Sequence, residues 1–470
     1  MNTLAHLQLM NSALAQSGDL SDYKALVVLF KFGGNDANNM LIPRMGHAGY
    51  ADYKASRGIL RILDSNDPDY VAGSPASIAV SDGTYGVHPN MQPVANLFNA
   101  GRLAFVANVG TLSYPITRAQ YLAGSVPVPP QLFSHSDQQL QWQSSVPDQP
   151  FATGWGGRVA DLLLSSGYSG DQVSLSITIA GINSLQVGNE VVQYAVTSAG
   201  AVPLSGYGTN YSLALNADGS YRTTTQGRRL KAFEDIMRYT HQHLLEEGYN
   251  EVVRRARGNE ALIGAAFTEA AASGVDFDGI FTAANANTSL GTQLRTIARL
   301  IAGRNSIANR RQIFFCSVGG YDTHQNQLLA HGNLMSELAN SLSAFNTTLD
   351  QLGVSSNVLT VTHSDFTRTF TPNGNTATSG SDHGWGGHHV VMGGSVNGGQ
   401  IYGHFPSLRV NADQDVGGNR GRWIPTTAVD QYAARAAGWM GVDGSAMASI
   451  FPNLGRFADP FGGTANLGFI

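Results

Sequence analysis

The chain has 470 residues, 42% of them hydrophobic, and a formal net charge of −5 at pH 7, so it can bury a large core. The acidic balance offers no basic surface for nucleic acid, and no apolar run approaches the ~20 residues of a membrane span. Only 13% of the residues are charged, below the share of about 25% in average soluble domains. Such a low share is common in exported proteins, and we expect a soluble protein.

The N-terminus resembles the end of an export signal. Residues 13–15 form an Ala-x-Ala pattern, which is typical of signal-peptide cleavage sites. No Lys or Arg precedes Lys24, so the positively charged start of a complete signal peptide is missing. We expect residues 1–22 to be the remainder of a leader or an ordinary disordered tail, with the mature protein beginning between residues 16 and 23.

Apolar runs alternate with segments of helical spacing along the rest of the chain. The apolar runs predict β-strands at residues 25–32, 103–109, 173–180, 312–318 and 358–362. Two stripes of apolar residues at steps of three or four, beginning at Leu294 and Leu334, predict helices that face a core. This alternation predicts an α/β fold with a parallel or mixed sheet between helices. We expect one domain over residues 23–470, with a mainly helical segment around 226–305.

Polar clusters follow three of the predicted strands. Asp36 lies in a Gly-Gly-Asn-Asp turn after the first strand, Asp322 and His324 follow the fourth, and Asp365 follows the fifth. Ligands of open α/β sheets bind in the crevice beyond the carboxyl ends of the strands. Each Asp alone could cap a helix or make an Asx turn. Together they predict a shared site.

The segment 381–389 reads Ser-Asp-His-Gly-Trp-Gly-Gly-His-His and places one carboxylate and three imidazoles within nine residues. Its glycines predict a pliable loop that can fold closely around an ion. Imidazole and carboxylate together suit zinc, manganese and related divalent ions. The alternative is a His-rich surface loop that binds nothing.

Two other segments, residues 113–145 and 371–380, are predicted to be long loops. The first holds four prolines, and the second is a polar run of Gly, Thr, Ser and Asn. Long loops beside a site often act as lids or binding loops.

The first of these loops holds candidate catalytic residues. In the Pro-Ile-Thr-Arg stretch at 115–118, Thr117 could act as a nucleophile while Arg118 holds an anionic oxygen. We favour a simpler interpretation in which Thr117 caps a helix and Arg118 joins an ordinary ion pair. Further along, His135 and Asp137 are candidates for acid–base catalysis or substrate contact.

These motifs together resemble the bacterial domain-of-unknown-function family 1501, which is itself similar to the alkaline phosphatase and sulfatase superfamily. The resemblance spans nearly the whole chain and rests on motifs at residues 33–36, 86–89, 154–158, 320–324, 382–389 and 421–427. It implies an alkaline phosphatase/sulfatase-like central mixed sheet flanked by helices. It also implies one or two divalent metals beside a nucleophile, and export through a twin-arginine leader.

Carried over residue by residue, the resemblance implies the metal ligands Asp36, Asp322, His324, Asp365, His383 and His388. The superfamily commonly has an Asp-His pair where this chain has Asp365-Phe366, so a ligand of a second ion is missing. We therefore expect one tightly held ion, zinc or manganese, rather than two. Replacing His388 with Ala should then release most of the metal, and Asp365→Ala should release little.

The resulting hypothesis is a periplasmic or secreted, metal-dependent hydrolase of phosphate or sulfate esters, acting on a small-molecule or glycan anionic ester. The alternative is a catalytically inactive, exported structural or assembly protein that retains the fold and part of the metal site. A third possibility is a glycan-binding module with aromatic stacking faces, although such residues are more often core. Its candidate stacking residues are Trp142, Trp155, Tyr321 and Trp385.

Overall fold

The computed structural model describes residues 22–168, 173–198, 200–201, 204–208, 211–216, 218–238, 259–462 and 466–470. Apart from its last residue, the predicted leader at 1–22 lies outside this part of the chain. Among the described helices, none combines the length and the apolar character that crossing a membrane requires.

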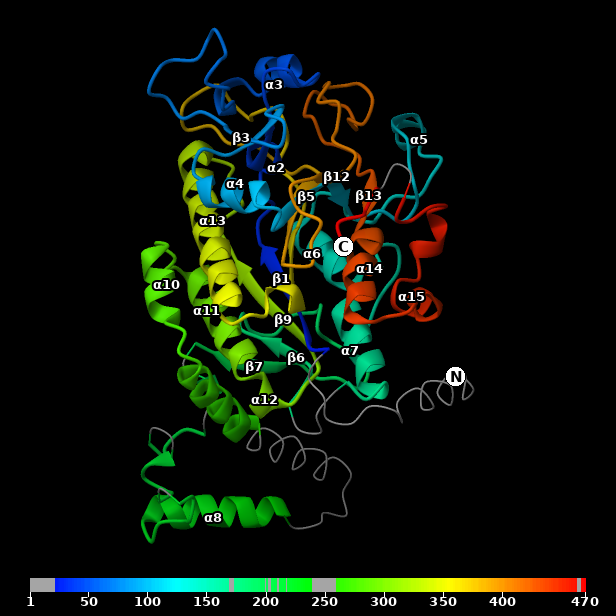
Figure 1. The fold of residues 1–470 in the computed structure, drawn as a ribbon. Helices are drawn as coiled ribbons and strands as arrows, with labels where there is room; N and C mark the ends of the chain where they lie inside the picture. The colour runs from blue at the N-terminus through cyan, green and yellow to red at the C-terminus, as the bar shows by residue number, and fades with distance from the viewer. Residues whose placement is uncertain are drawn as a thin grey trace.

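A ten-stranded mixed sheet forms the centre of the molecule, which confirms the predicted α/β fold (Figure 1). Its strands are β1 (Lys24–Lys31), β5 (Leu103–Gly110), β6 (Ser176–Thr178), β7 (Tyr194–Thr197), β8 (Gly200–Ala201), β9 (Arg311–Val318), β10 (Val358–Ser364), β11 (Gly387–Met392), β12 (Ile401–Gly403) and β13 (Thr427–Ala428). Their order is β12-β5-β11-β10-β1-β9-β6-β7-β8, with β13 beside β5. All five predicted strands are present, the third of them shorter than expected.

The directions of the strands explain where a site can form. β10, β1 and β9 are parallel and in register, with Lys31 opposite both Ser364 and Val318. β11 is antiparallel to β10 and to β5, so β5 runs in the same direction as β10. The carboxyl ends of β1, β5, β9 and β10 and the start of β11 therefore meet at one edge of the sheet.

Helices cover both faces of the sheet (Figure 1). One face carries α4 (Gln92–Asn99), α10 (Phe277–Ala283), α11 (Ser289–Ala302) and α13 (Gln327–Gln351), and the other carries α7 (Trp155–Ser165), α14 (Val429–Met440) and α15 (Gly444–Ile450). Side chains of β1 alternate between the two cores: Val27 packs into the first and Val28 into the second. The two predicted apolar stripes lie in α11 and α13 and face the first core, as expected.

The remaining elements are shorter or peripheral. The helices are α2 (Ala37–Met40), α3 (Tyr50–Ser56), α5 (Arg118–Ala123), α6 (His135–Ser144), α8 (Thr225–Arg238) and α12 (Arg304–Ile307), with short 3₁₀ turns at Gly58–Leu60, Ser355–Asn357 and Leu454–Arg456. A second sheet has the order β2 (Leu41–Pro43), β4 (Tyr85–Val87), β3 (Ile78–Val80). The segment predicted to be mainly helical contains most of α8, residues 259–272, α10 and α11, while 239–258 lie outside the described residues.

Two loop predictions are wrong in part. Residues 113–145 contain α5 and α6, and α5 begins at a capping box between Thr117 and Gln120. In the His-rich segment, the loop ends at Gly386, and His388 lies inside β11. Pairing of Gly387 and His389 with β5 on either side of His388 overrides the flexibility that glycine allows. The segment 371–380 has neither helix nor strand, as predicted.

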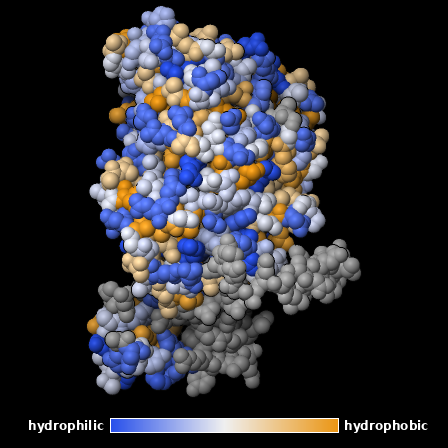
Figure 2. All heavy atoms as spheres, in the orientation of Figure 1, coloured by the Kyte–Doolittle hydropathy of each residue, from blue (hydrophilic) through white to orange (hydrophobic). Residues whose placement is uncertain are grey.

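The four aromatic side chains considered for glycan stacking are core residues, which confirms the interpretation favoured from the sequence. Each is at most 1% exposed: Trp142, Trp155, Tyr321 and Trp385. Figure 2 shows hydrophobic residues scattered among hydrophilic ones on the face that it draws. Scattered apolar residues are normal on a protein surface and indicate no binding face by themselves.

Candidate metal centre

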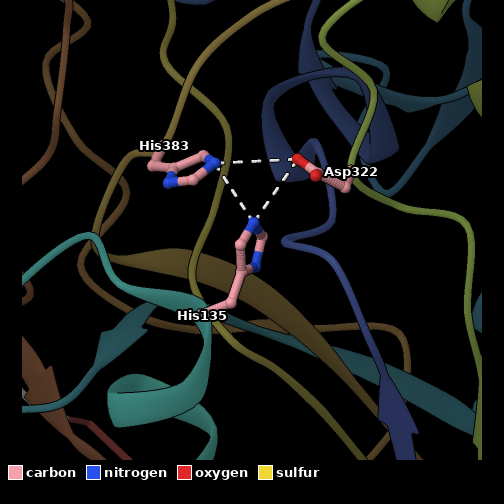
Figure 3. Close-up of side chains that lie close together, drawn as sticks. All are labelled: His135, Asp322 and His383. Atoms are coloured by element: carbon pink, nitrogen blue, oxygen red, sulfur yellow. Dashed lines mark hydrogen bonds and ion pairs between the residues drawn. The ribbon is translucent and has the colours of Figure 1, made fainter.

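Three side chains from separate parts of the chain meet at the sheet edge where the strand ends converge. Asp322 follows β9, His383 precedes β11, and His135 is the first residue of α6. Their side chains point toward one another (Figure 3), and one ligand atom from each lies within 4.8 Å of the others. Such a group of imidazole and carboxylate donors could hold a metal ion.

The distances between the donor atoms suit a single ion. His135 Nε2 lies 3.1 Å from His383 Nε2 and 3.4 Å from Asp322 Oδ1, and His383 Nε2 lies 3.6 Å from the same oxygen. A fourth donor, His324 Nε2, is 3.0 Å from both His383 Nε2 and Asp322 Oδ1. Tetrahedral ligands held ~2.0 Å from zinc are about 3.3 Å apart. The spacing therefore fits a zinc-like ion.

The hydrogen bonds on the far side of each ring fix its tautomer. His383 Nδ1 donates to the Phe133 carbonyl at 2.7 Å, and a carbonyl oxygen can only accept. His135 Nδ1 lies 2.6 Å from Asp365 Oδ2, and His324 Nδ1 lies 3.1 Å from Asp382 Oδ1. With Nδ1 donating, each neutral ring presents the lone pair of Nε2. Three Nε2 lone pairs and a carboxylate oxygen that face one another form a donor set that a divalent ion can bind.

Asp365 lies behind His135 rather than among the converging atoms. The carboxylate is fully buried and also accepts hydrogen bonds from Gly33 N at 3.1 Å and Gln139 Nε2 at 2.9 Å. Its hydrogen bond raises the pKa of His135, although burial of the ring opposes the shift. Asp365 thus orients a ligand, as carboxylates behind metal-binding histidines commonly do.

Asp322 is held ionised and remains accessible. Burial acts to raise its pKa, but the hydrogen bond and charge of Arg368 prevail, and the pKa lies below its usual value. Arg368 Nη1 donates to Asp322 Oδ1 at 2.7 Å. The side chains of Asp322 and His324 are 48% and 43% exposed, so the centre is open to solvent on this side.

Two residues that the resemblance implies as ligands do not join the group. The buried carboxylate of Asp36 forms an ion pair with Arg57 and accepts a hydrogen bond from Gln327 Nε2 at 2.5 Å. His388 Nδ1 accepts from Asn108 N at 3.2 Å, and burial lowers the pKa of this ring to about 3. Of the implied ligands, the structure therefore brings Asp322, His324 and His383 together. Asp365 contacts the centre only through its hydrogen bond with His135.

The candidate nucleophile Thr117 caps α5, as the favoured interpretation predicts: its hydroxyl accepts from Gln120 N. Arg118 Nε donates to the Asp415 carbonyl at 2.8 Å instead of pairing with a carboxylate. Both residues line a cavity of about 460 Å³ to which no residue of the centre contributes. His135 was predicted for acid–base catalysis or substrate contact, and not as a metal ligand. Its position after β5, whose end lies at the same edge as β9 and β10, is the signal that could have identified it as a ligand.

Comparisons with known proteins give a family but no function. Two crystal structures of Ps i-CgsB, one of them in complex with k-i-k-neocarrahexaose, are 10% identical to this chain, with a TM-score of 0.31. Each alignment covers 92% of this chain and 77% of the other, and a similarity this low carries no argument. No curated protein matches the sequence. The model of the family described as "Protein of unknown function (DUF1501)" matches residues 23–419, and the chain therefore belongs to that family.

Proposed function

We propose that the protein is a metal-dependent hydrolase of phosphate or sulfate esters, with the ion held by His135, Asp322 and His383 and with His324 beside them. The observation that carries this proposal is the convergence of imidazole lone pairs on one carboxylate oxygen. When bound, a divalent ion would polarise an ester oxygen and stabilise the charge of the leaving group. We propose zinc, because nitrogen donors predominate and the donor spacing is close to tetrahedral.

One ion is proposed rather than two. A second ion would need carboxylates of its own, because its added charge has to be neutralised. Arg57 already neutralises Asp36, and the oxygens of Asp365 accept hydrogen bonds from Gly33, Gln139 and His135. The charge of Asp36 is thus already balanced by Arg57, and both oxygens of Asp365 already accept hydrogen bonds.

We propose Ser134 as the hydroxyl that attacks the ester. It directly precedes His135 at the start of α6, where its side chain does not cap the helix. Its hydroxyl instead donates to Asp137 Oδ2 at 2.5 Å, so that carboxylate can accept the proton when the oxygen attacks. Ser134→Ala should abolish turnover with metal retained, whereas Thr117→Ala, at a remote helix cap, should leave turnover intact.

The competing proposal is a catalytically inactive structural protein. Phe366 stacks on the ring of His383, with a centroid distance of 4.7 Å, and packs at a tilt against the ring of His135 at 4.8 Å. If His324 binds as well, four protein side chains surround the ion, and structural zinc sites have such closed sets. Export to the periplasm or medium remains a proposal for either function, and sequencing the N-terminus of native protein would test it.

Metal analysis combined with ester assays separates the two proposals. The purified protein should contain about one equivalent of zinc, and His383→Ala should lose it. His388→Ala is the matched control and should retain the ion, because its ring lies in β11. Aryl phosphate mono- and diesters and aryl sulfates should be hydrolysed only with metal present. Bound zinc without turnover of any ester would favour the structural protein, and absence of bound metal would refute the centre.

A further inference from the structure

Two arginines border the candidate metal centre on the segment that leads into Trp423. Arg420 Nη1 donates to Asp382 Oδ2 at 2.8 Å, and its side chain is 42% exposed. Arg422 Nε donates to the His383 carbonyl at 2.7 Å, and its guanidinium lies 4.4 Å from the centre of the Phe133 ring. Each contact engages one guanidinium nitrogen and leaves the other N–H donors of the planar guanidinium available to bind a ligand.

The segment that carries both arginines is held by a buried carboxylate. Asp415 Oδ1 accepts from Arg422 N at 2.9 Å and from Gly417 N at 3.2 Å, and Asp415 Oδ2 accepts from Asn411 N at 2.7 Å. The Arg420 carbonyl accepts from Thr371 N at 3.1 Å. The backbone of the two arginines is therefore fixed before any ligand binds, which lowers the entropic cost of binding.

The charges around the centre do not balance once a metal is bound. Asp322 is paired with Arg368, and Asp382 is paired with Arg420. No described carboxylate lies within ion-pair distance of Arg422. Adding a divalent ion increases the positive charge, which an anionic ligand would neutralise.

We propose that Arg420 and Arg422 form a binding site for a tetrahedral oxyanion, so that the centre selects phosphate or sulfate groups over neutral esters. Guanidinium forks match the paired oxygens of such groups. The inference rests on the proposed function for the identity of the ester, but binding of the anion does not require turnover. It makes the two arginines specificity-determining residues of the centre.

Titration calorimetry of inorganic phosphate, and separately of inorganic sulfate, into the zinc-loaded full chain tests the proposal. We expect the double variant Arg420→Gln/Arg422→Gln to bind the tighter-binding anion at least tenfold more weakly than the wild type. The zinc content of the variant should be unchanged. The tighter of the two anions identifies the ester class. Arg409→Gln is the matched control: it lies on the neighbouring loop, paired with Asp413 and 59% exposed, and should bind the anion as the wild type does.

Arg422 also holds the His383 carbonyl, so Arg420→Gln alone and Arg422→Lys are measured beside the double variant. Both should remain folded by thermal denaturation, and both should lose part of the anion affinity. Unchanged affinity in the double variant, or no binding of either anion to the zinc-loaded wild type, would overturn the inference. Anion binding that depends on the arginines in a protein that hydrolyses no ester would support the inference and refute the proposed function.

Discussion

At the residue scale, the hydrogen bond from His135 to Asp365 determines which ring nitrogen faces the centre. Asp365→Asn removes the charge and converts one acceptor atom into a donor, so it should weaken zinc binding by about 10- to 100-fold. Competition with a chromogenic chelator measures the change. The sequence predicted the opposite order for metal binding: replacing His388 should release most of the metal, and replacing Asp365 should release little.

The comparison with His388 makes the test specific. His388→Ala should leave zinc affinity unchanged, because the ring accepts from Asn108 N and makes no contact with the donor atoms of the centre. If His388→Ala releases zinc while Asp365→Asn does not, the ion is not held by the group around His135.

At the scale of secondary structure, the sequence predicts where the centre lies better than which residues make it. Strand positions follow from apolar runs, and parallel strands bring Asp322 and Asp365 to one edge whatever the details of packing. The start of β11 was not predictable in this way, because Gly387 and His388 show none of the apolar character that marks a strand. The pairing of Asp365 with His135 depends on tertiary packing between distant segments, and no local pattern encodes it.

The glycines at the start of α7 give an element-scale prediction. Gly157 N donates to the Leu185 carbonyl at 2.8 Å, and a Cβ at Gly157 would overlap the backbone of Val187. Gly157→Ala should therefore lower the free energy of unfolding by about 1–3 kcal/mol. Urea denaturation measures the change.

Gly264 is the matched control. It is exposed in the helix at residues 259–272, and a Cβ there would meet nothing within 4 Å. Gly264→Ala should raise the free energy of unfolding by about 0.5–1 kcal/mol, because Ala has the higher helix propensity. Equal effects of the two substitutions would show that the approach of α7 to Val187 is not tight.

At the scale of the whole molecule, a buried carboxylate makes stability depend on pH. Asp430, in the first turn of α14, is fully buried. Burial raises its pKa from 3.8 to about 7, although a hydrogen bond from the Ser145 side chain and the charge of Arg158 oppose the shift. Between these two values the folded state binds a proton that the unfolded state has lost. The contribution of Asp430 to the free energy of unfolding is therefore greatest at acidic pH, and it falls as the pH rises to about 7.

Asp430→Asn keeps the shape of the side chain and removes the titration. The free energy of unfolding of the variant, relative to wild type, should rise by about 2–3 kcal/mol between pH 5 and pH 7 and level off above pH 7, since each pH unit in this window is worth about 1.4 kcal/mol. Urea denaturation at a series of pH values measures the difference.

Asp443→Asn, at the N-cap of α15, is the control: hydrogen bonds from Ser445 and Ala446 lower the pKa of Asp443, so it stays ionised throughout this range. Its difference from wild type should be flat. A flat difference for Asp430→Asn as well would mean that water or a cation neutralises the buried carboxylate.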